Sequence, residues 1–448
     1  MLAPSGSLPI DMPSSPDQSG RRLRAPDRPS PRASGGRHAA GSCAAARADY
    51  HDGDESPGRP SPDVSALPII DSVQIGMHWF AEQPGGLERM YLALSDGLPG
   101  AGVRVRGLLA GGERAALDTH GAIRAFARAD APLLTRLWGA RQALKAMIAA
   151  RRPDIVASHF PLYGLPTRGV ATDSARVTHF HGPWADEARA EGGQCTVNRL
   201  KHALETFAYG RQQRYIVLSR AFADVLARRY RVPPERIRVV PGCVDVSTFA
   251  VPASRAQARA RLALPTDRPI LVTVRRLTRR MGLENLIDAM PALLSAVPDA
   301  LLVVVGRGPL AEALAARIAE RGLERHVHLL GRVGDGMLPL VYRAADLSIV
   351  PSLSLEGFGL TTVESLAAGT PVMVTPVGGL PEAVCGLDRN LVLAGTSPAA
   401  LADGLRGALR GGTALPSEAR CRRYARENFD MPLMARRVAA VYREALRG

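Results

Sequence analysis

The sequence is poor in aromatic residues, cysteines and long apolar runs, and each shortage excludes a class of protein. Aromatic residues make up 5% of the chain and no RNA-binding or zinc-finger pattern occurs, so we expect no nucleic-acid partner. The five cysteines are widely scattered and form no Cys-x-x-Cys pair, which indicates no zinc site and fits a reducing cytoplasm. No run approaches the roughly 18 apolar residues of a membrane-spanning helix, and the N-terminus shows no secretory signal. We therefore predict a cytoplasmic protein.

Arginine, by contrast, is abundant and gives the chain a formal net charge of +15. Such an excess attracts nucleic acid, an acidic substrate or an anionic membrane surface, although it can also reflect the base composition of a genome. Because nucleic-acid motifs are missing, an acidic substrate is the favoured partner. Peripheral contact with the cytoplasmic face of an anionic membrane stays open.

The length of 448 residues exceeds one typical core and indicates two domains. The N-terminal segment is rich in Pro, Ser, Gly and Arg without apolar periodicity, so we expect it to be disordered. Beyond it, strands alternate with helices, which predicts an α/β fold with parallel sheets. The expected boundaries are 1–67 for the extension, 68–247 for an N-terminal Rossmann-like domain, 248–265 for a linker, 266–430 for a C-terminal Rossmann-like domain and 431–448 for a final helix.

The most informative stretch, at 347–368, joins an apolar strand to a helix. The turn between them contains Gly357-Phe358-Gly359-Leu360, and its glycines let the backbone approach a ligand closely. Backbone N–H groups and the positive end of the helix dipole converge at this turn. The stretch therefore favours an anion such as a phosphate.

Two carboxylates bracket this turn. Glu364 lies in the first turns of the helix predicted over 361–368, where it can accept hydrogen bonds from ribose hydroxyls, and we expect it to face a ligand rather than the core. Glu356 can meet hydroxyls beyond the phosphates. Because acids favour helix starts for dipole reasons alone, a structural role for either glutamate taken singly stays open.

A basic run follows the strand predicted at 270–274. Its arginines Arg276, Arg279 and Arg280 can neutralise a pyrophosphate. No Asp-x-Asp segment that could carry a divalent ion occurs in the body of the chain, so we expect no metal and no other cofactor.

The first half of the chain supplies further candidates. Gly85 and Gly86 lie between a short strand and a helix, as at the entry of a βα unit. His181 lies at the end of a strand-like run, where open α/β sheets place ligand groups, whereas we interpret His179 as structural.

These residues together resemble retaining glycosyltransferases of family 4, also called group 1 glycosyltransferases, which have the GT-B fold. The Glu356-x7-Glu364 spacing carries the resemblance, and supporting residues extend from about Ser72 onward. The resemblance implies two Rossmann-like domains facing across a cleft, a nucleotide-sugar donor and a final helix that crosses back onto the first domain. It assigns catalysis to His181 and Glu356, donor binding to Arg276, Gly357, Phe358, Gly359, Leu360 and Glu364, and the acceptor side of the cleft to Gly85 and Gly86. We add Arg280 to the donor-binding residues for the reason given next.

The chain departs from the family in its basic run. Arg275 stands where the family commonly has Gly, and Met281 stands where it has a Lys before Gly282. A methionine cannot neutralise phosphate, so one interpretation is a weakened enzyme. We expect instead that Arg280 compensates and holds the diphosphate together with Arg276, with Arg279 or Arg275 as the next candidates.

The predicted function is transfer of a hexosyl-type sugar to a hydroxyl acceptor with retention, in polysaccharide, glycolipid or glycoconjugate biosynthesis. The acceptor would be a glycan, a lipid-linked sugar or a small molecule. Three alternatives stay open. They are a dinucleotide oxidoreductase, a non-enzymatic or differently acting nucleotide-binding Rossmann protein, and a protein that uses its basic charge to bind nucleic acid or membrane. The Gly306-Arg-Gly308 segment resembles the start of the Gly-x-Gly-x-x-Gly motif of dinucleotide-binding oxidoreductases. However, Ala311 stands in place of the third glycine, and no acid that could bind ribose follows.

Overall fold

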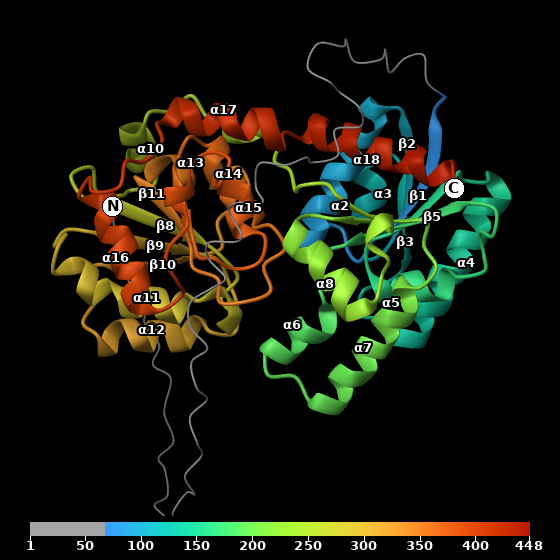
Figure 1. Cartoon of the computed structure of the whole chain (residues 1–448), viewed down its shortest axis with the longest axis horizontal. Helices are drawn as coiled ribbons and strands as arrows, with labels where there is room; N and C mark the ends of the chain where they lie inside the picture. The colour runs from blue at the N-terminus through green and yellow to red at the C-terminus, as the bar shows by residue number, and fades with distance from the viewer. Residues whose placement is uncertain (1–67) are drawn as a thin grey trace, which may run out of the picture. The chain divides into compact units, whose positions relative to one another are not determined.

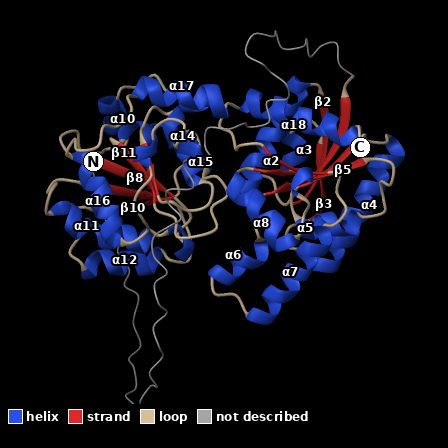
Figure 2. Cartoon of the chain, in the orientation of Figure 1, coloured by secondary structure: helices blue, strands red, loops and turns tan. Residues whose placement is uncertain are grey.

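The computed structural model describes residues 68–448, which contain two parallel β-sheets flanked by helices (Figure 1). Strands occupy the centre of each half and helices surround them (Figure 2). The predicted α/β class with two Rossmann-like sheets is confirmed. The extension expected at 1–67 lies outside the described residues.

The first sheet has seven strands in the order β3-β2-β1-β4-β5-β6-β7. The chain moves outward from β1 to β3 and then returns to the other side of β1 at β4, so the strand order reverses between β1 and β4. The strands are β1 (Ile70–Ile75), β2 (Val103–Ala110), β3 (Ile123–Ala127), β4 (Ile155–Ser158), β5 (Ala175–Phe180), β6 (Arg214–Val217) and β7 (Ile237–Val239). Their helices are α2 (Gly86–Gly97), α3 (Arg114–Asp118), α4 (Leu133–Ala150), α5 (Pro161–Gly164), α6 (Trp184–Ala190), α7 (Cys195–Tyr209) and α8 (Arg220–Tyr230).

The second sheet has five strands in the order β10-β9-β8-β11-β12, and its order reverses between β8 and β11. The strands are β8 (Ile270–Val274), β9 (Leu301–Val305), β10 (Val327–Gly331), β11 (Leu347–Val350) and β12 (Val372–Val374). The accompanying helices are α11 (Leu283–Leu294), α12 (Ala311–Glu320), α13 (Leu338–Ala344), α14 (Leu360–Ala367), α15 (Leu380–Val384), α16 (Pro398–Leu409), α17 (Glu418–Phe429) and α18 (Met431–Leu446).

Successive residues of the central strands enter two different cores. Leu302 and Val304 of β9 pack in the cluster that contains α11, α12 and α16, whereas Leu301 and Val303 pack in the cluster that contains α13, α14 and α17. A strand points alternate side chains to opposite faces, so a strand covered on both faces must be apolar throughout. The continuous apolar runs of this half follow from that requirement.

The last helix of the chain packs on the first sheet. Met434, Val438 and Tyr442 of α18 lie in one cluster with Ile70 of β1 and Ile155 of β4. Figure 1 shows this red helix beside α2 and β5. The side chain of Tyr442 thereby reaches the centre of the first sheet, close to the ends of β4 and β5.

The segment expected as a linker contains two short helices, α9 (Val246–Phe249) and α10 (Arg255–Arg261). Arg259 of α10 donates to Asp346 Oδ2 at 2.6 Å and to the carbonyl oxygen of Ala344 at 2.9 Å, which fastens this helix beside the second sheet. Across residues 68–448, no helix combines the length and the apolar character needed to cross a membrane.

Candidate active site

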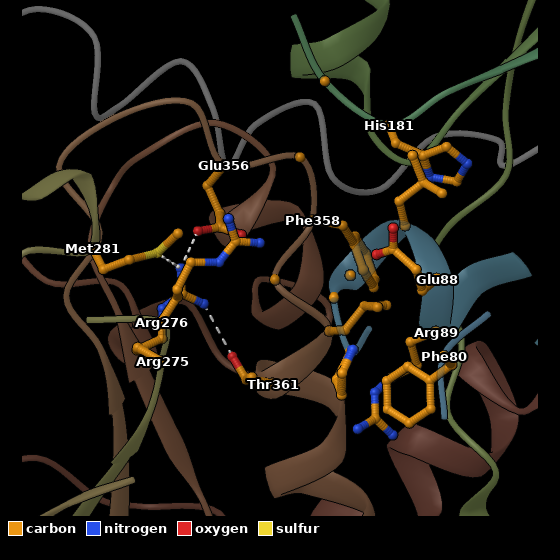
Figure 3. Close-up of a pocket in the computed structure, with 18 of the residues that line it drawn as sticks. Phe80, Glu88, Arg89, His181, Arg275, Arg276, Met281, Glu356, Phe358 and Thr361 are labelled. Atoms are coloured by element: carbon orange, nitrogen blue, oxygen red, sulfur yellow. Dashed lines mark hydrogen bonds and ion pairs between the residues drawn. The ribbon is translucent and has the colours of Figure 1, made fainter. Parts of the chain in front are cut away.

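A cleft with a volume of about 650 Å³ opens at the carboxyl ends of both sheets (Figure 3). One wall comes from the loops after β1, β4 and β5, and the other from the loops after β8, β9, β10 and β11. This is where open α/β sheets bind ligands, beside a reversal of strand order. The residues nominated from the sequence as catalytic, donor-binding or acceptor-side all line this cleft.

The turn before α14 brings backbone rather than side chains to the cleft. Gly359 caps the helix with a φ of 77°, a left-handed conformation that glycine adopts without strain. A Cβ on Gly357 would lie 2.7 Å from a ring carbon of Phe222, so this position needs glycine as well. The Phe358 side chain is buried against Phe429, so the contribution of Phe358 to the cleft is its main chain.

Glu364 lies one turn into α14 and is buried, with 3% of its surface exposed. Its Oε2 accepts a hydrogen bond from the Tyr342 hydroxyl at 2.9 Å, and its Oε1 pairs with Arg89 Nε at 3.3 Å. The carboxylate also lines the cleft. The expectation that this acid faces away from the core is therefore wrong, because it is buried. Its role toward a ligand stays a prediction.

Arg89 joins the two walls of the cleft. Besides Glu364, its guanidinium pairs with Asp335 at 3.3 Å and stacks over the Phe80 ring at 4.5 Å. All four of these residues line the cleft. Arg89 was not among the site residues expected from the sequence, although it follows the Gly-Gly pair at the start of α2.

Glu356 is held in place by a second turn. The preceding Leu355 has a φ of 55°, which is uncommon for a residue other than glycine. Ser352 Oγ donates to Glu356 Oε2 at 2.8 Å, and the same oxygen pairs with Arg275. A Cβ on Gly378 would lie 2.0 Å from the carbonyl oxygen of Glu356, so the glycine turn after β12 packs directly on the backbone of this acid.

Arg275 follows β8 and places its guanidinium beneath the cleft. Only 5% of its side chain is exposed. Nη2 donates to Ser352 Oγ at 2.7 Å and touches Met281 Sδ, while Nη1 donates to Thr361 Oγ1 at 3.2 Å (Figure 3). Nε is buried and has no hydrogen-bond partner within residues 68–448. From the sequence, this arginine was expected only as an alternative to Arg280 for holding the diphosphate.

The two arginines expected to hold the diphosphate differ in their surroundings. Arg276 is exposed at the cleft, and its side chain makes no hydrogen bond or ion pair with the described residues, so its guanidinium donors are available. Arg280 pairs with Glu191 at 3.3 Å and Glu187 at 3.7 Å, and donates to the carbonyl oxygen of Leu355 at 3.2 Å. The diphosphate role expected of Arg280 stays a prediction, and these partners occupy its donors.

The Gly-x-Gly segment after β9 packs closely against the backbone of the loop after β8. A Cβ on Gly306 would lie 1.7 Å from the carbonyl oxygen of Arg275, and one on Gly308 would lie 2.4 Å from that of Leu277. Leu277 N also donates to Arg307 O at 2.9 Å. These glycines therefore let the loops after β8 and β9 pack against each other, which accounts for them without a dinucleotide.

The opposite wall contains a second helix start. Gly85 is the N-cap of α2, and Gly86 is its first residue, with no atom within 4 Å of a Cβ built there. Glu88 lies in the same turn, and burial raises the pKa of its carboxyl group, while the nearby charge of Arg276 lowers it. The N-termini of α2 and α14 thus both contribute residues to one cleft.

His181 follows β5 and presents its ring to the cleft beside a second histidine. His159 follows β4, the neighbouring strand, and its Nδ1 lies 3.2 Å from His181 Nε2. Nδ1 of His181 is buried without a partner among residues 68–448. Burial lowers the pKa of His181 to about 4, so the ring is neutral at physiological pH.

A chain of hydrogen bonds determines which nitrogens of these rings carry protons. His159 Nε2 lies 2.9 Å from Gln74 Oε1, an atom that can only accept, so His159 carries its proton on Nε2. His159 Nδ1 must then accept from His181 Nε2. The Tyr442 hydroxyl lies 3.2 Å from the same Gln74 oxygen and 2.9 Å from His179 Nε2. The chain leaves Nδ1 of His181 as a bare acceptor.

Two family profiles match successive parts of the sequence. The profile described as "Glycosyltransferase Family 4" matches residues 84–248, and "Glycosyl transferases group 1" matches residues 254–428. The chain belongs to the group 1 glycosyltransferases of family 4. The first matched segment contains β2 to β7 and the second contains β8 to β12.

Curated relatives of this glycosyltransferase family include a D-inositol 3-phosphate glycosyltransferase of Corynebacterium glutamicum. It is 31% identical over 271 residues, which cover 56% of this chain and 63% of the relative. A GDP-mannose-dependent alpha-(1-6)-phosphatidylinositol monomannoside mannosyltransferase of Mycobacterium tuberculosis is 35% identical over 178 residues, 38% of this chain and 46% of the relative. The matches thus span less than two thirds of either relative.

Solved structures of other glycosyltransferases share the fold. The sucrose-phosphate synthase of Thermosynechococcus elongatus superposes with a TM-score of 0.69 at 22% identity, covering 84% of this chain and 99% of that one. HepE of Anabaena in complex with UDP-glucose gives 0.67 at 20% identity, covering 84% and 100%. At these identities the likeness concerns the fold, and it confirms the expected GT-B architecture.

The site combines three chemical capacities. The helix starts and Arg276 can bind an anion, the carboxylates of Glu356 and Glu364 can accept hydrogen bonds from hydroxyls, and His181 offers an uncharged acceptor. Within residues 68–448, no group of three or more His, Cys, Asp or Glu is arranged as metal ligands. Metal independence stays a prediction.

Proposed function

We propose that this protein transfers a sugar from a nucleoside-diphosphate sugar to a hydroxyl acceptor with retention of anomeric configuration. The observation that carries the proposal is the composition of one cleft. Two helix N-termini and an unpaired arginine favour a diphosphate, and two carboxylates beside them favour a polyhydroxylated ligand. Few ligand classes other than nucleotide sugars combine both groups.

In this proposal each group has a distinct part. Arg276 and the amides at the start of α14 stabilise the diphosphate as it leaves the sugar, the step in which negative charge develops. Glu364 accepts hydrogen bonds from the ribose, and Glu356 orients the sugar. His181, with Nδ1 unprotonated and without a charge, accepts a hydrogen bond from a sugar hydroxyl without opposing the positive charge that develops at the anomeric carbon.

The names of the relatives support a particular class of product. The Corynebacterium relative is named for an inositol phosphate acceptor and the Mycobacterium relative for a phosphatidylinositol mannoside. HepE of Anabaena is described with UDP-glucose. We therefore propose a hexosyl donor and a role in polysaccharide, glycolipid or glycoconjugate biosynthesis, with membrane contact confined to the acceptor.

The test has two stages. First, a panel of UDP-, GDP-, ADP- and dTDP-hexoses is screened for an increase in melting temperature, with the nucleosides as controls. Second, any stabilising donor is incubated with inositol phosphate, glycan and glycolipid acceptors, and the anomeric coupling constant of the product is read by proton NMR. A product with the donor's configuration supports the proposal. Stabilisation without transfer would favour the non-enzymatic nucleotide-binding alternative, and inversion would contradict retention.

A further inference from the structure

The cleft contains an unusual cation. Arg275 stands where the family commonly has Gly, and six residues further along Met281 stands where it has Lys. These two departures meet in space, because Arg275 Nη2 touches Met281 Sδ. Both residues are buried and both line the cleft.

The contact brings the guanidinium close to where a lysine ammonium at 281 would lie. The Sδ atom of methionine is the third atom of its side chain and corresponds to Cδ of a lysine, so an ammonium at 281 would lie two bonds beyond it. Nη2 of Arg275 lies 2.7 Å from this sulfur. Arg275 therefore brings a positive charge to the place where Met281 has none.

The partners of this guanidinium point toward the anion site. Nη1 donates to Thr361 Oγ1 at 3.2 Å, and Thr361 is in the first turn of α14, where the helix dipole favours an anion. Glu356 offsets the charge on the other side. Nε keeps one buried donor without a partner in the described part of the chain. A buried donor left unpaired is costly, which is expected of a group that acquires its partner from a ligand.

We propose that Arg275 supplies the buried positive charge next to the donor's diphosphate and that Arg275 with Met281 replaces a lysine at 281. This inference rests on the proposed nucleotide-sugar function. It revises the compensation expected from Arg280, whose donors are already engaged by Glu187, Glu191 and a carbonyl oxygen. The positive charge beside the diphosphate is then kept, but it comes from position 275 instead of position 281.

The test exchanges the two positions and measures nucleoside-diphosphate binding by titration calorimetry. UDP and GDP are titrated into the wild type, into Arg275→Met, Arg275→Gly and Met281→Lys, and into the double variant Arg275→Gly/Met281→Lys. Uridine and guanosine are titrated in parallel, since they lack the diphosphate. Arg261→Ala is the matched control, because this arginine is exposed and does not line the cleft.

We expect Arg275→Met and Arg275→Gly to raise the Kd of the bound diphosphate by about tenfold or more, the loss of one charge-assisted contact, and to leave nucleoside binding unchanged. The double variant should bind within about threefold of the wild type, which a purely structural role of Arg275 would not produce. Met281→Lys alone should bind no tighter and should melt lower, because it buries two cations side by side.

Three outcomes would overturn the inference while the proposed function survives. They are wild-type diphosphate affinity in Arg275→Met, a double variant as weak as Arg275→Gly, or tighter binding by Met281→Lys alone. Should the single Arg275 variants fail to fold, the double variant carries the test, since it retains one cation at the same place. If the wild type binds no nucleoside diphosphate, the proposed function fails and takes this inference with it.

Discussion

His159 Nδ1 and His181 Nε2 lie 3.2 Å apart, at the ends of two adjacent parallel strands. Because Gln74 obliges His159 to carry its proton on Nε2, His159 can only accept from its neighbour. The ring that faces the cleft is therefore held in one tautomer by His159, which Gln74 orients in turn, and Gln74 Oε1 also accepts from Tyr442 of the last helix. The C-terminal helix thus contributes to the site as well as to the core.

The first prediction concerns this pair. His159→Phe keeps an aromatic ring in the stack but removes the acceptor for His181, so the tautomer is no longer fixed. We expect kcat to fall by about tenfold with KM nearly unchanged, since a misplaced proton affects the reacting state most. Nitrogen-15 NMR of His181 should show both tautomers. His328→Phe, at an exposed position on β10, is the control. A single tautomer in His159→Phe would contradict this assignment.

The second prediction concerns the dependence of stability on pH. Burial lowers the pKa values of His159 and His179 well below 6.5 and that of His181 to about 4. Below pH 6.5 the unfolded chain therefore binds more protons at these rings than the folded chain, so the free energy of unfolding falls as the pH drops from 6.5 to 4. His181, being only partly buried by surface area, contributes least.

Urea unfolding at several pH values measures this effect. In His179→Gln, which retains a donor toward Tyr442, the slope of unfolding free energy against pH should be shallower than in the wild type. Carboxylates titrate in both proteins and cancel in the difference. Equal slopes would show that protonation of His179 is not linked to folding.

The third prediction separates the two roles of Glu364. Glu364→Ala leaves the Tyr342 hydroxyl without its acceptor, so it should cost about 1–3 kcal/mol of stability along with donor binding. Tyr342→Phe removes the same hydrogen bond from the other side, and should lower stability but leave donor affinity close to that of the wild type. Chemical unfolding and donor titration of both variants measure this. Loss of donor affinity in Tyr342→Phe would mean that the ribose role and the core role cannot be separated.

The fourth prediction concerns the turn that packs on Glu356. Gly378 has a φ of 55°, and a Cβ there would meet the carbonyl oxygen of Glu356 at 2.0 Å, so Gly378→Ala must displace the backbone of the acid. We expect a loss of about 1–3 kcal/mol in stability and of most activity. Gly334→Ala, with no atom within 4 Å of the new Cβ, should change neither. Full activity of Gly378→Ala would show that the position of Glu356 is not critical.

The fifth prediction concerns metal. Arginines and helix amides already offer positive charge to the diphosphate, so transfer should proceed after dialysis against a chelator. The rate with and without added magnesium or manganese should agree within experimental error. Inactivation by the chelator that either ion reverses would mean that a metal completes the site.

Much of the second half could be predicted because its signals are local. The helix expected at 361–368 is found as α14, Leu360–Ala367, and the final helix expected at 431–448 is found as α18, Met431–Leu446. A strand, a glycine turn and a helix follow one another within about twenty residues, so the local sequence alone indicates that Glu356 and Glu364 bracket a turn at the end of a strand. The strand β3 was not expected, since its Ile123–Ala127 run is short and at a sheet edge.

Most contacts between residues that are far apart along the chain could not be predicted from the sequence. His159 could have been found, because it directly follows a predicted strand just as His181 does, and parallel strands end at the same edge. The partners of Arg280 could not, because Glu187 and Glu191 belong to the opposite wall of the cleft. The contact of Arg275 with Met281 depends on how a loop turns back on itself, which residue types alone do not specify.

The central claim is that a nucleoside diphosphate leaves as the sugar is transferred, and phosphorus-31 NMR tests it most directly. The purified protein is incubated with the nucleotide sugar that stabilises it and with an acceptor, and the two phosphate resonances are followed. The account predicts that the β-phosphate resonance moves to the position of a terminal phosphate, which shows that the bond between sugar and phosphate has broken. Cleavage within the diphosphate, with nucleoside monophosphate and sugar phosphate as products, would contradict it, as would no conversion of any donor that binds.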